Sequence, residues 1–281
     1  KYDQVSDDND SISTSSDEDS HEESNVWKNW LKFPNAEKNN TNFHPFSPEK
    51  HKIVRCGHGI SPRPYLDPSL YKKHLKRHKV LRFPLLVECT TYIDAVLNSN
   101  TIRIFEKKIM AVPEFENNNI QNAVDFLNDI FLSALRLYKS KQDLTSSESV
   151  FNHLLIYRFM DSVALSIQNK HDCGSDFIPG EAYLSAYKAD GIIKMISIRD
   201  LELLLVETSG PYANIDKTKS NFDHHKGTFG TLAMLKTIAD EFNYAQIDIF
   251  VNVKILMQIY EIETSIHLWS LPFKKEGIYE L

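Results

Sequence analysis

Cysteine is scarce in this chain of 281 residues, with Cys56, Cys89 and Cys173 lying far apart. An odd and scattered set excludes a disulfide-rich scaffold and indicates a reducing, intracellular compartment. No run of eighteen or more residues is apolar, so we expect neither a membrane-spanning helix nor a membrane partner. The chain also lacks G-x-S-x-G, P-loop and G-x-G-x-x-G motifs, which argues against the enzyme classes that use them.

Negative charge is concentrated at the start of the chain. Residues 1–24 hold nine Asp or Glu and one Lys, a balance of −8, whereas the whole chain carries −6, so the remainder is close to neutral at +2. This Ser-rich segment has few large apolar groups and therefore predicts a disordered acidic tail. The tail could act as a kinase substrate at Ser16 or Ser20, as a solubilising tail, or as an adaptor for unidentified basic protein partners.

Two further parts follow the tail. We expect residues 25–82 to form a segment that is irregular at first and basic in its second part. Residues 83–281 should form an α/β domain with a core at 145–272. We expect the large apolar side chains at the start of the second part to dock on the main body: Trp27, Trp30, Leu31, Phe33, Phe43 and Phe46.

Helical periodicity is clear in three places. Apolar residues at helical spacing predict one helix over 119–139 and another from Ser146 to about Gln168. A third helix is expected from Asp223 to Phe242. Residues 83–115 instead suggest two strands, or a strand and a short helix.

The strands are expected mainly after a hinge at 171–176. Three β-rich stretches should cover 181–188, 189–198 and 201–209, and two long strands should cover 246–256 and 257–271. This order predicts an α/β (α+β) fold with a mixed central sheet flanked by helices. The apolar run Leu203–Val206 suits a central strand that is covered on both faces.

Two carboxylates stand near the ends of strand-like segments. Asp190 and Glu207 are seventeen positions apart, a separation that antiparallel neighbours with a short turn can accommodate. Burying Glu207 among aliphatics is costly unless it meets a cation or hydrogen-bond donors. Asp190 adjoins Gly191, where a ligand could approach the backbone. Two such oxygen ligands favour Mg²⁺ or Mn²⁺, which would polarise a phosphate and lower the pKa of bound water.

A purely structural interpretation is also open. Asp190 could be a turn residue before Gly191, and Glu207 could form a semi-buried ion pair with Lys226. Neither residue would then need a metal.

Three short motifs carry a resemblance to a known family. They read Lys188-Ala-Asp190, Glu207-Thr-Ser-Gly-Pro211 and Asp223-His-His-Lys226. With these motifs and the expected order of elements, residues 145–272 resemble the PD-(D/E)XK nuclease superfamily. They look more closely like a set of uncharacterised fungal proteins. The resemblance implies a restriction-endonuclease-like core and Mg²⁺- or Mn²⁺-dependent hydrolysis of a nucleic acid, with DNA as the first expectation.

The resemblance also implies roles for single residues. Asp190 and Glu207 would bind the metal, together with the backbone carbonyl of Thr208. Glu148 matches an extra acid that many members carry on the preceding helix. Lys226, on the following helix, would replace the lysine that the motif has at Ser209. The Ser at that position leaves a second function open, a non-enzymatic module that binds nucleic acid or protein, and the direction of Lys226 distinguishes the two.

The basic segment resembles a degenerate C2H2 zinc finger over 56–78. Its zinc ligands would be Cys56, His58, His74 and His78. The closing pair has the spacing that puts both imidazoles on one helix face, whereas one residue separates the opening pair, fewer than usual. The alternatives are a solvated helix face or a basic arm, which would contact phosphates or signal nuclear import, with Lys72, Lys73, Lys76, Arg77 and Lys79.

Overall fold

The computed structural model describes residues 44, 47–55, 68–77, 85–171, 173–180, 182–184, 187–251, 253–260, 266–275 and 278–281 of the chain. Several predictions lie outside these residues: the acidic tail at 1–24, most of the aromatic stretch at 25–48, and the side chains of Cys56, His58, His78 and Lys79. His74 and Arg77 belong to a described helix, but their side chains are not described.

The described helices and helical turns are η2 (Pro48–His51), α2 (Pro68–Arg77), α3 (Val87–Leu97), α4 (Ile102–Ile109), α5 (Asn118–Ser140), α6 (Glu148–Phe151), η3 (Asn152–Ile156), α7 (Tyr157–His171), α8 (Lys217–Glu241) and α9 (Ile247–Phe250). The strands are β1 (Ile53–Val54), β2 (Ser175–Pro179), β3 (Ala182–Leu184), β4 (Tyr187–Lys188), β5 (Gly191–Met195), β6 (Leu201–Thr208), β7 (Lys254–Tyr260), β8 (Ile266–Lys275) and β9 (Ile278–Glu280).

Seven strands form one mixed sheet in the order β1-β9-β8-β7-β6-β5-β2. The strands β2, β5 and β6 form an antiparallel meander, and β7 then lies parallel to β6. A parallel neighbour requires a crossover connection, which α8 supplies. The short hairpin of β3 and β4 stands apart from this sheet. The predicted mixed sheet flanked by helices is therefore confirmed.

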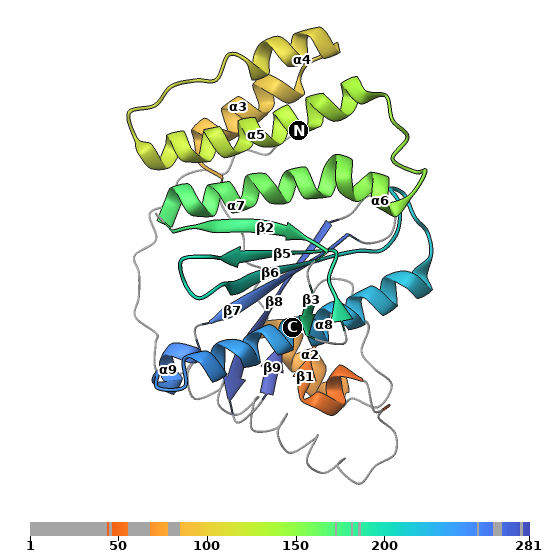
Figure 1. Cartoon of the computed structure of the whole chain (residues 1–281), viewed down its shortest axis with the longest axis vertical. Helices are drawn as coiled ribbons and strands as arrows, with labels where there is room; N and C mark the ends of the chain where they lie inside the picture. The colour runs from red at the N-terminus through yellow and green to blue at the C-terminus, as the bar shows by residue number, and fades with distance from the viewer. Residues whose placement is uncertain are drawn as a thin grey trace.

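Side chains of β6 alternate between two apolar cores. Leu204 and Val206 pack in the core that α6, η3 and α7 cover. Leu205 packs against Met234 and Leu235 of α8 on the other face. Figure 1 shows α7 on one side of the sheet and α8 on the other. All three strand residues are buried, as a central strand requires, and alternation turns Glu207 toward α8 together with Leu205.

A layer of three further helices lies outside α7. α5 packs on α7, and α3 and α4 pack on α5 (Figure 1). The helix predicted at 119–139 is confirmed as α5, but the strands predicted within 83–115 are wrong. In α3 the buried residues Cys89, Tyr92 and Val96 fall three and four positions apart, which is helical spacing. The side chain of Thr101 accepts a hydrogen bond from the backbone N–H of Ile104 and so caps α4.

Other boundaries also differ from the predictions. The last two residues of the expected hinge begin β2, and the first residues of an expected strand form α9. α8 begins at Lys217, six residues before the predicted start. The cause is Asp216, whose side chain accepts hydrogen bonds from the backbone N–H groups of Thr218 and Lys219 and caps the helix.

Two features that the sequence was expected to lack are disulfide bonds and a membrane-spanning helix. Cys89 and Cys173 are free thiols, and Cys56 is outside the described part of the chain. Among the described helices, none combines the length and the apolar character needed to cross a membrane.

Gly191 is a point of close approach within the sheet, but not for a ligand. A Cβ atom built on Gly191 would lie 2.3 Å from Cε2 of Phe177, whose ring crosses over the glycine from the neighbouring strand. The expectation that Gly191 admits a ligand is therefore wrong. The glycine instead lets an aromatic side chain of β2 close the face of the sheet that packs against α7.

We expect Gly191→Ala to lower the free energy of unfolding by about 1–3 kcal/mol, because the ring of Phe177 must move out of its packed position. Gly174→Ala is the matched control, since its Cβ would meet only ordinary contacts of 3.7 and 3.8 Å. Urea unfolding of the two variants and the wild type measures the difference. Equal midpoints for all three proteins would contradict the prediction.

Candidate functional site

Asp190 and Glu207 lie side by side where β5 begins and β6 ends. Gly191 pairs with Val206 in the antiparallel ladder, so the two carboxylates occupy adjoining positions, as the sequence predicted. The backbone N–H of Asp190 donates to the carbonyl of Val206 at 3.1 Å. In return, the backbone N–H of Thr208 donates to Oδ2 of Asp190 at 2.6 Å. The sheet itself therefore holds the Asp190 carboxylate.

Glu207 is fully buried, with 0% of its surface exposed. Lys226 of α8 donates to Oε2 of Glu207 at 2.6 Å, whereas Oε1 accepts no hydrogen bond from any described residue. Burial raises the pKa of Glu207 to about 8, although the charge of Lys226 opposes the shift. The lysine thus points toward the carboxylate pair and not away from it.

Lys219 is a second cation at the site, and the sequence did not predict it. Its Nζ lies 2.9 Å from Oε2 of Glu148 and 3.1 Å from Oδ2 of Asp223. It also lies 3.4 Å from the carbonyl oxygen of Thr208. Burial lowers the pKa of Lys219, but its hydrogen bonds to Glu148 and Asp223 outweigh burial, so the net shift is upward.

One face of α8 supplies most of these contacts. Lys219, Asp223 and Lys226 stand at positions i, i+4 and i+7 of the helix, which places them on one side. Asp223 is buried and was quoted in the sequence only as part of a motif. The spacing of the three charged residues could have predicted that they share one helix face. That prediction requires knowing that α8 begins before Lys219.

The opposite wall comes from the helix that precedes the sheet. Glu148 opens α6, where the side chain of Ser147 caps the first turn. Tyr157 follows the π-helical turn η3 and was also missed. Burial raises the pKa of Tyr157, and the charges of Asp190 and Glu148 raise it further, which puts the phenol within electrostatic reach of both acids.

The acids outnumber the lysines. Glu148, Asp190, Glu207 and Asp223 face Lys219 and Lys226, so the cluster carries an excess of two negative charges if every group is ionised. Burial raises the pKa of Asp190, and the charges of Glu148 and Asp223 add to that shift. A proton or a cation would relieve this excess. Even so, the described part of the chain holds no group of three or more Asp, Glu, His or Cys side chains arranged as a ready metal centre.

Ser209, which stands where the nuclease motif has lysine, is buried next to Glu207. Its hydroxyl has no hydrogen-bond partner among the described residues. The carbonyl of Ser209 accepts a hydrogen bond from the side chain of Asn214, and Gly210 turns the chain with a φ of 106°. The strand therefore offers no positive charge here, and Lys226 is the described cation in contact with Glu207.

The predicted basic helix is confirmed as far as Arg77, the last residue of α2. Lys72, Lys73 and Lys76 are exposed on it. Three of the four predicted zinc ligands lie outside the described residues, as does Lys79, so both the zinc site and the nucleic-acid contact stay predictions.

Comparison of the chain with known protein families, with curated proteins and with solved structures found no match. The resemblance to the PD-(D/E)XK superfamily therefore rests on the motifs and the order of elements alone.

The raised pKa of Glu207 predicts a pH-dependent stability in metal-free buffer. The folded protein holds this proton with a pKa of about 8, against an ordinary value of 4.5, so the stabilisation is present below pH 4.5. It is lost as the pH rises toward 8 and above. We expect the free energy of unfolding of the wild type to fall over this range. The fall should exceed that of Glu207→Gln by on the order of 2–4 kcal/mol.

Urea unfolding at pH 5 and pH 9 in the presence of a chelator measures this difference. Glu241→Gln is the matched control, because it removes an exposed carboxylate at the far end of the same helix. A wild type and a Glu207→Gln variant with the same pH dependence would show that Glu207 does not titrate as described.

Proposed function

We propose that residues 145–272 form a PD-(D/E)XK-like domain that hydrolyses phosphodiester bonds of a nucleic acid with Mg²⁺ or Mn²⁺. One observation carries the proposal: Lys226 contacts Glu207 at 2.6 Å, beside Asp190 on the adjoining strand. The two acids and the lysine of the nuclease motif thus meet in space, although the lysine has moved from the strand to the helix.

The order of elements supports the same proposal. A helix leads into the antiparallel strands β2, β5 and β6, and α8 then crosses over to the parallel strand β7. The family resemblance implies this arrangement, in which the two carboxylates share one end of the sheet. Because one fold can serve many functions, the site supports the proposal more strongly than the fold does.

The donor set fits a divalent cation. Asp190 and Glu207 would hold the ion, with the carbonyl of Thr208 as a further ligand. Oε1 of Glu207 is buried and accepts no hydrogen bond from a described residue, and the cluster has an excess of negative charge. Carboxylate and carbonyl oxygens are the ligands that Mg²⁺ and Mn²⁺ prefer. When bound, such an ion would polarise a phosphate and lower the pKa of a water molecule.

The chain's own residues would divide the remaining work. Lys226 donates to Glu207 in the free protein, and its ammonium can stabilise negative charge that develops on a phosphate in the transition state. Lys219 and Glu148 are each partly exposed, so they border the entrance to the buried pair. Lys219 could therefore exchange its contact with Glu148 for a phosphate oxygen and orient the substrate.

A specific observation also favours a second function, a binding module without cleavage. Lys219 and Lys226 already serve as counterions to Glu148, Asp223 and Glu207 within the chain. Ser209 adds no charge to replace them. With these three carboxylates paired, the cluster can remain stable without a metal, and the same surface could then bind a nucleic acid or a protein without cutting it.

The nuclease assay uses the full chain with labelled DNA and RNA, single- and double-stranded, in Mg²⁺, in Mn²⁺ and in chelator. We expect metal-dependent cleavage that falls on the order of 10²-fold or more in Asp190→Asn, Glu207→Gln and Lys226→Met, because each variant removes charge at the reacting phosphate. Glu241→Gln should cleave like the wild type.

Binding of the same nucleic acids, followed by fluorescence anisotropy, separates the two functions. Binding without cleavage in either metal would support the binding module and contradict the nuclease. Cleavage that persists unchanged in Asp190→Asn and Glu207→Gln would show that the activity arises elsewhere.

A further inference from the structure

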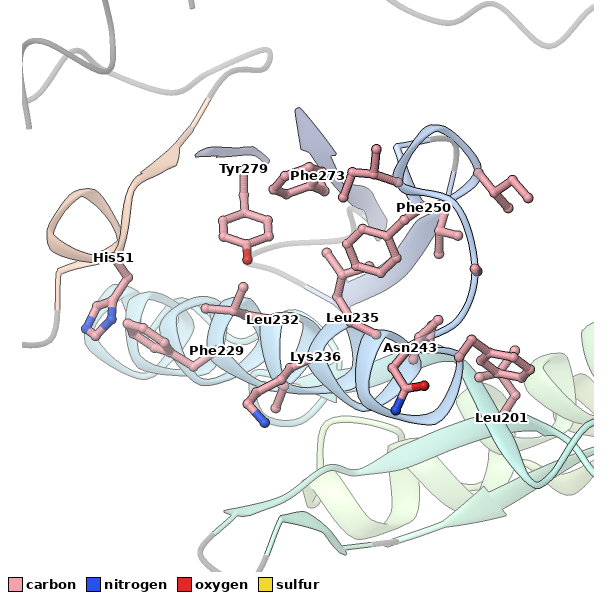
Figure 2. Close-up of a pocket in the computed structure, with 18 of the residues that line it drawn as sticks. His51, Leu201, Phe229, Leu232, Leu235, Lys236, Asn243, Phe250, Phe273 and Tyr279 are labelled. Carbon is pink, nitrogen blue, oxygen red and sulfur yellow. The ribbon is translucent and has the colours of Figure 1, made fainter. Parts of the chain in front are cut away.

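A large apolar groove runs along α8, between this helix and the end of the sheet formed by β8 and β9. Its volume is about 1320 Å³. Figure 2 shows Phe229, Leu232 and Leu235 along the helix, with Phe250, Phe273 and Tyr279 facing them from α9 and the end of the sheet. At one end, His51 of η2 lies against the ring of Phe229, with 5.0 Å between the ring centroids.

The groove leaves large apolar side chains in contact with water. Phe222 is 65% exposed at one end of the lining and Ile249 is 59% exposed at the other. Phe242 and Ile247 are also exposed along it. A continuous apolar surface of this kind marks a binding site for a partner. Among the described residues that line it, none is an aspartate or a glutamate.

The chain enters the described structure at the rim of this groove. His44 is the first described residue and lines the groove. His51, seven positions further along the chain, also lines it. The next residues, Ile53 and Val54, are fixed in the sheet by parallel pairing with β9. Residues 25–43 are therefore joined to the chain at the rim, with ten residues, 34–43, between Phe33 and His44.

The stretch between Trp27 and His44 is long enough to reach along the groove. The groove follows α8 from Phe222 to Phe242, which is about 30 Å at 1.5 Å per residue. The stretch between Trp27 and His44 can span up to about 56–61 Å when extended. A tethered segment also has an effective concentration on the order of millimolar, well above that of a separate protein at ordinary dilution.

The tethered segment has the side chains that such a groove requires. Trp30 and Leu31 lie three and four positions after Trp27, and Phe33 follows. This spacing is the one by which an amphipathic segment anchors its apolar face in a groove. The acidic residues upstream would meet no carboxylate in the described lining, so the strong negative charge of 1–24 does not oppose the contact.

We propose that residues 27–33 dock in the groove of their own chain. The tethering at His44, the matching reach and the aromatic spacing favour this occupant over a second copy. The proposal rests on other observations and another readout than the nuclease proposal, although Lys226 lines the groove as well as contacting Glu207.

Tryptophan fluorescence of the full chain tests the docking. The three tryptophans are Trp27, Trp30 and Trp269, so Trp269→Phe leaves the two in the segment as reporters. We expect blue-shifted emission that is protected from acrylamide. The difference spectrum between the wild type and Trp27→Phe/Trp30→Phe should give the same signal, which guards against an effect of Trp269→Phe on folding.

Variants on the groove locate the docked segment. Phe222→Asp and Ile249→Asp alter exposed positions at its two ends, so the fold should tolerate both. Each should shift the emission to the red and increase quenching at least twofold. Ile215→Asp is the matched control, because Ile215 is 78% exposed and does not line the groove.

Three results would overturn the proposal. The first is red-shifted, freely quenched emission in the starting protein. The second is a blue shift that disappears on dilution, which would assign the groove to a second copy. The third is a signal that Phe222→Asp and Ile249→Asp leave unchanged, which would put the tryptophans elsewhere on the protein.

Discussion

The burial of Glu207 is the constraint on which the arrangement of this domain depends. A carboxylate at the end of a strand covered on both faces loses its hydration, and a nearby positive charge must compensate if it is to ionise. Lys226 provides that charge from α8. The position of α8 against β6 is therefore set by an ion pair at one end and by apolar contacts through Met234 and Leu235 along the rest. The crossover to β7 follows from the same placement.

The cluster around this pair is a network of linked charges and not a single catalytic group. Lys219 holds Glu148 and Asp223, while the N–H of Thr208 holds Asp190. Two different elements, the start of α6 and the first turns of α8, therefore meet over the end of the sheet. Such a set is suited to accepting a cation or a phosphate, because the groups that would receive either one are already ordered.

Much of this could be predicted from residue patterns, and the failures have physical causes. The adjacency of Asp190 and Glu207 follows from strand alternation and a short turn, which local sequence determines. The helix α3 was read as a strand because Thr90, Thr91, Tyr92 and Ile93 favour strands locally, whereas packing on α5 decides for a helix. The strand β2 was missed because only Phe177 in it is buried, and Pro179 is tolerated at an edge.

The role of Lys219 illustrates the limit for sites. Its contacts depend on where α8 starts, and a cap at Asp216 determines that start. The groove was equally invisible, because a sequence shows which residues of a helix are apolar but not which of its sides the sheet leaves uncovered. In both cases the missing information is tertiary.

α8 presents Lys219, Asp223 and Lys226 to the end of the sheet and Phe222 and Phe229 to the groove, which Lys226 also lines, and the two sets interleave along one helix. Each residue turns the helix by about 100°, so a single insertion between Lys226 and Phe229 would rotate every later side chain out of place relative to the earlier ones. A change of about seven residues, close to two full turns, would restore the direction of the later side chains but would shift them by about 10 Å along the helix axis. The length of this stretch should thus resist insertion and deletion even where individual side chains could be replaced.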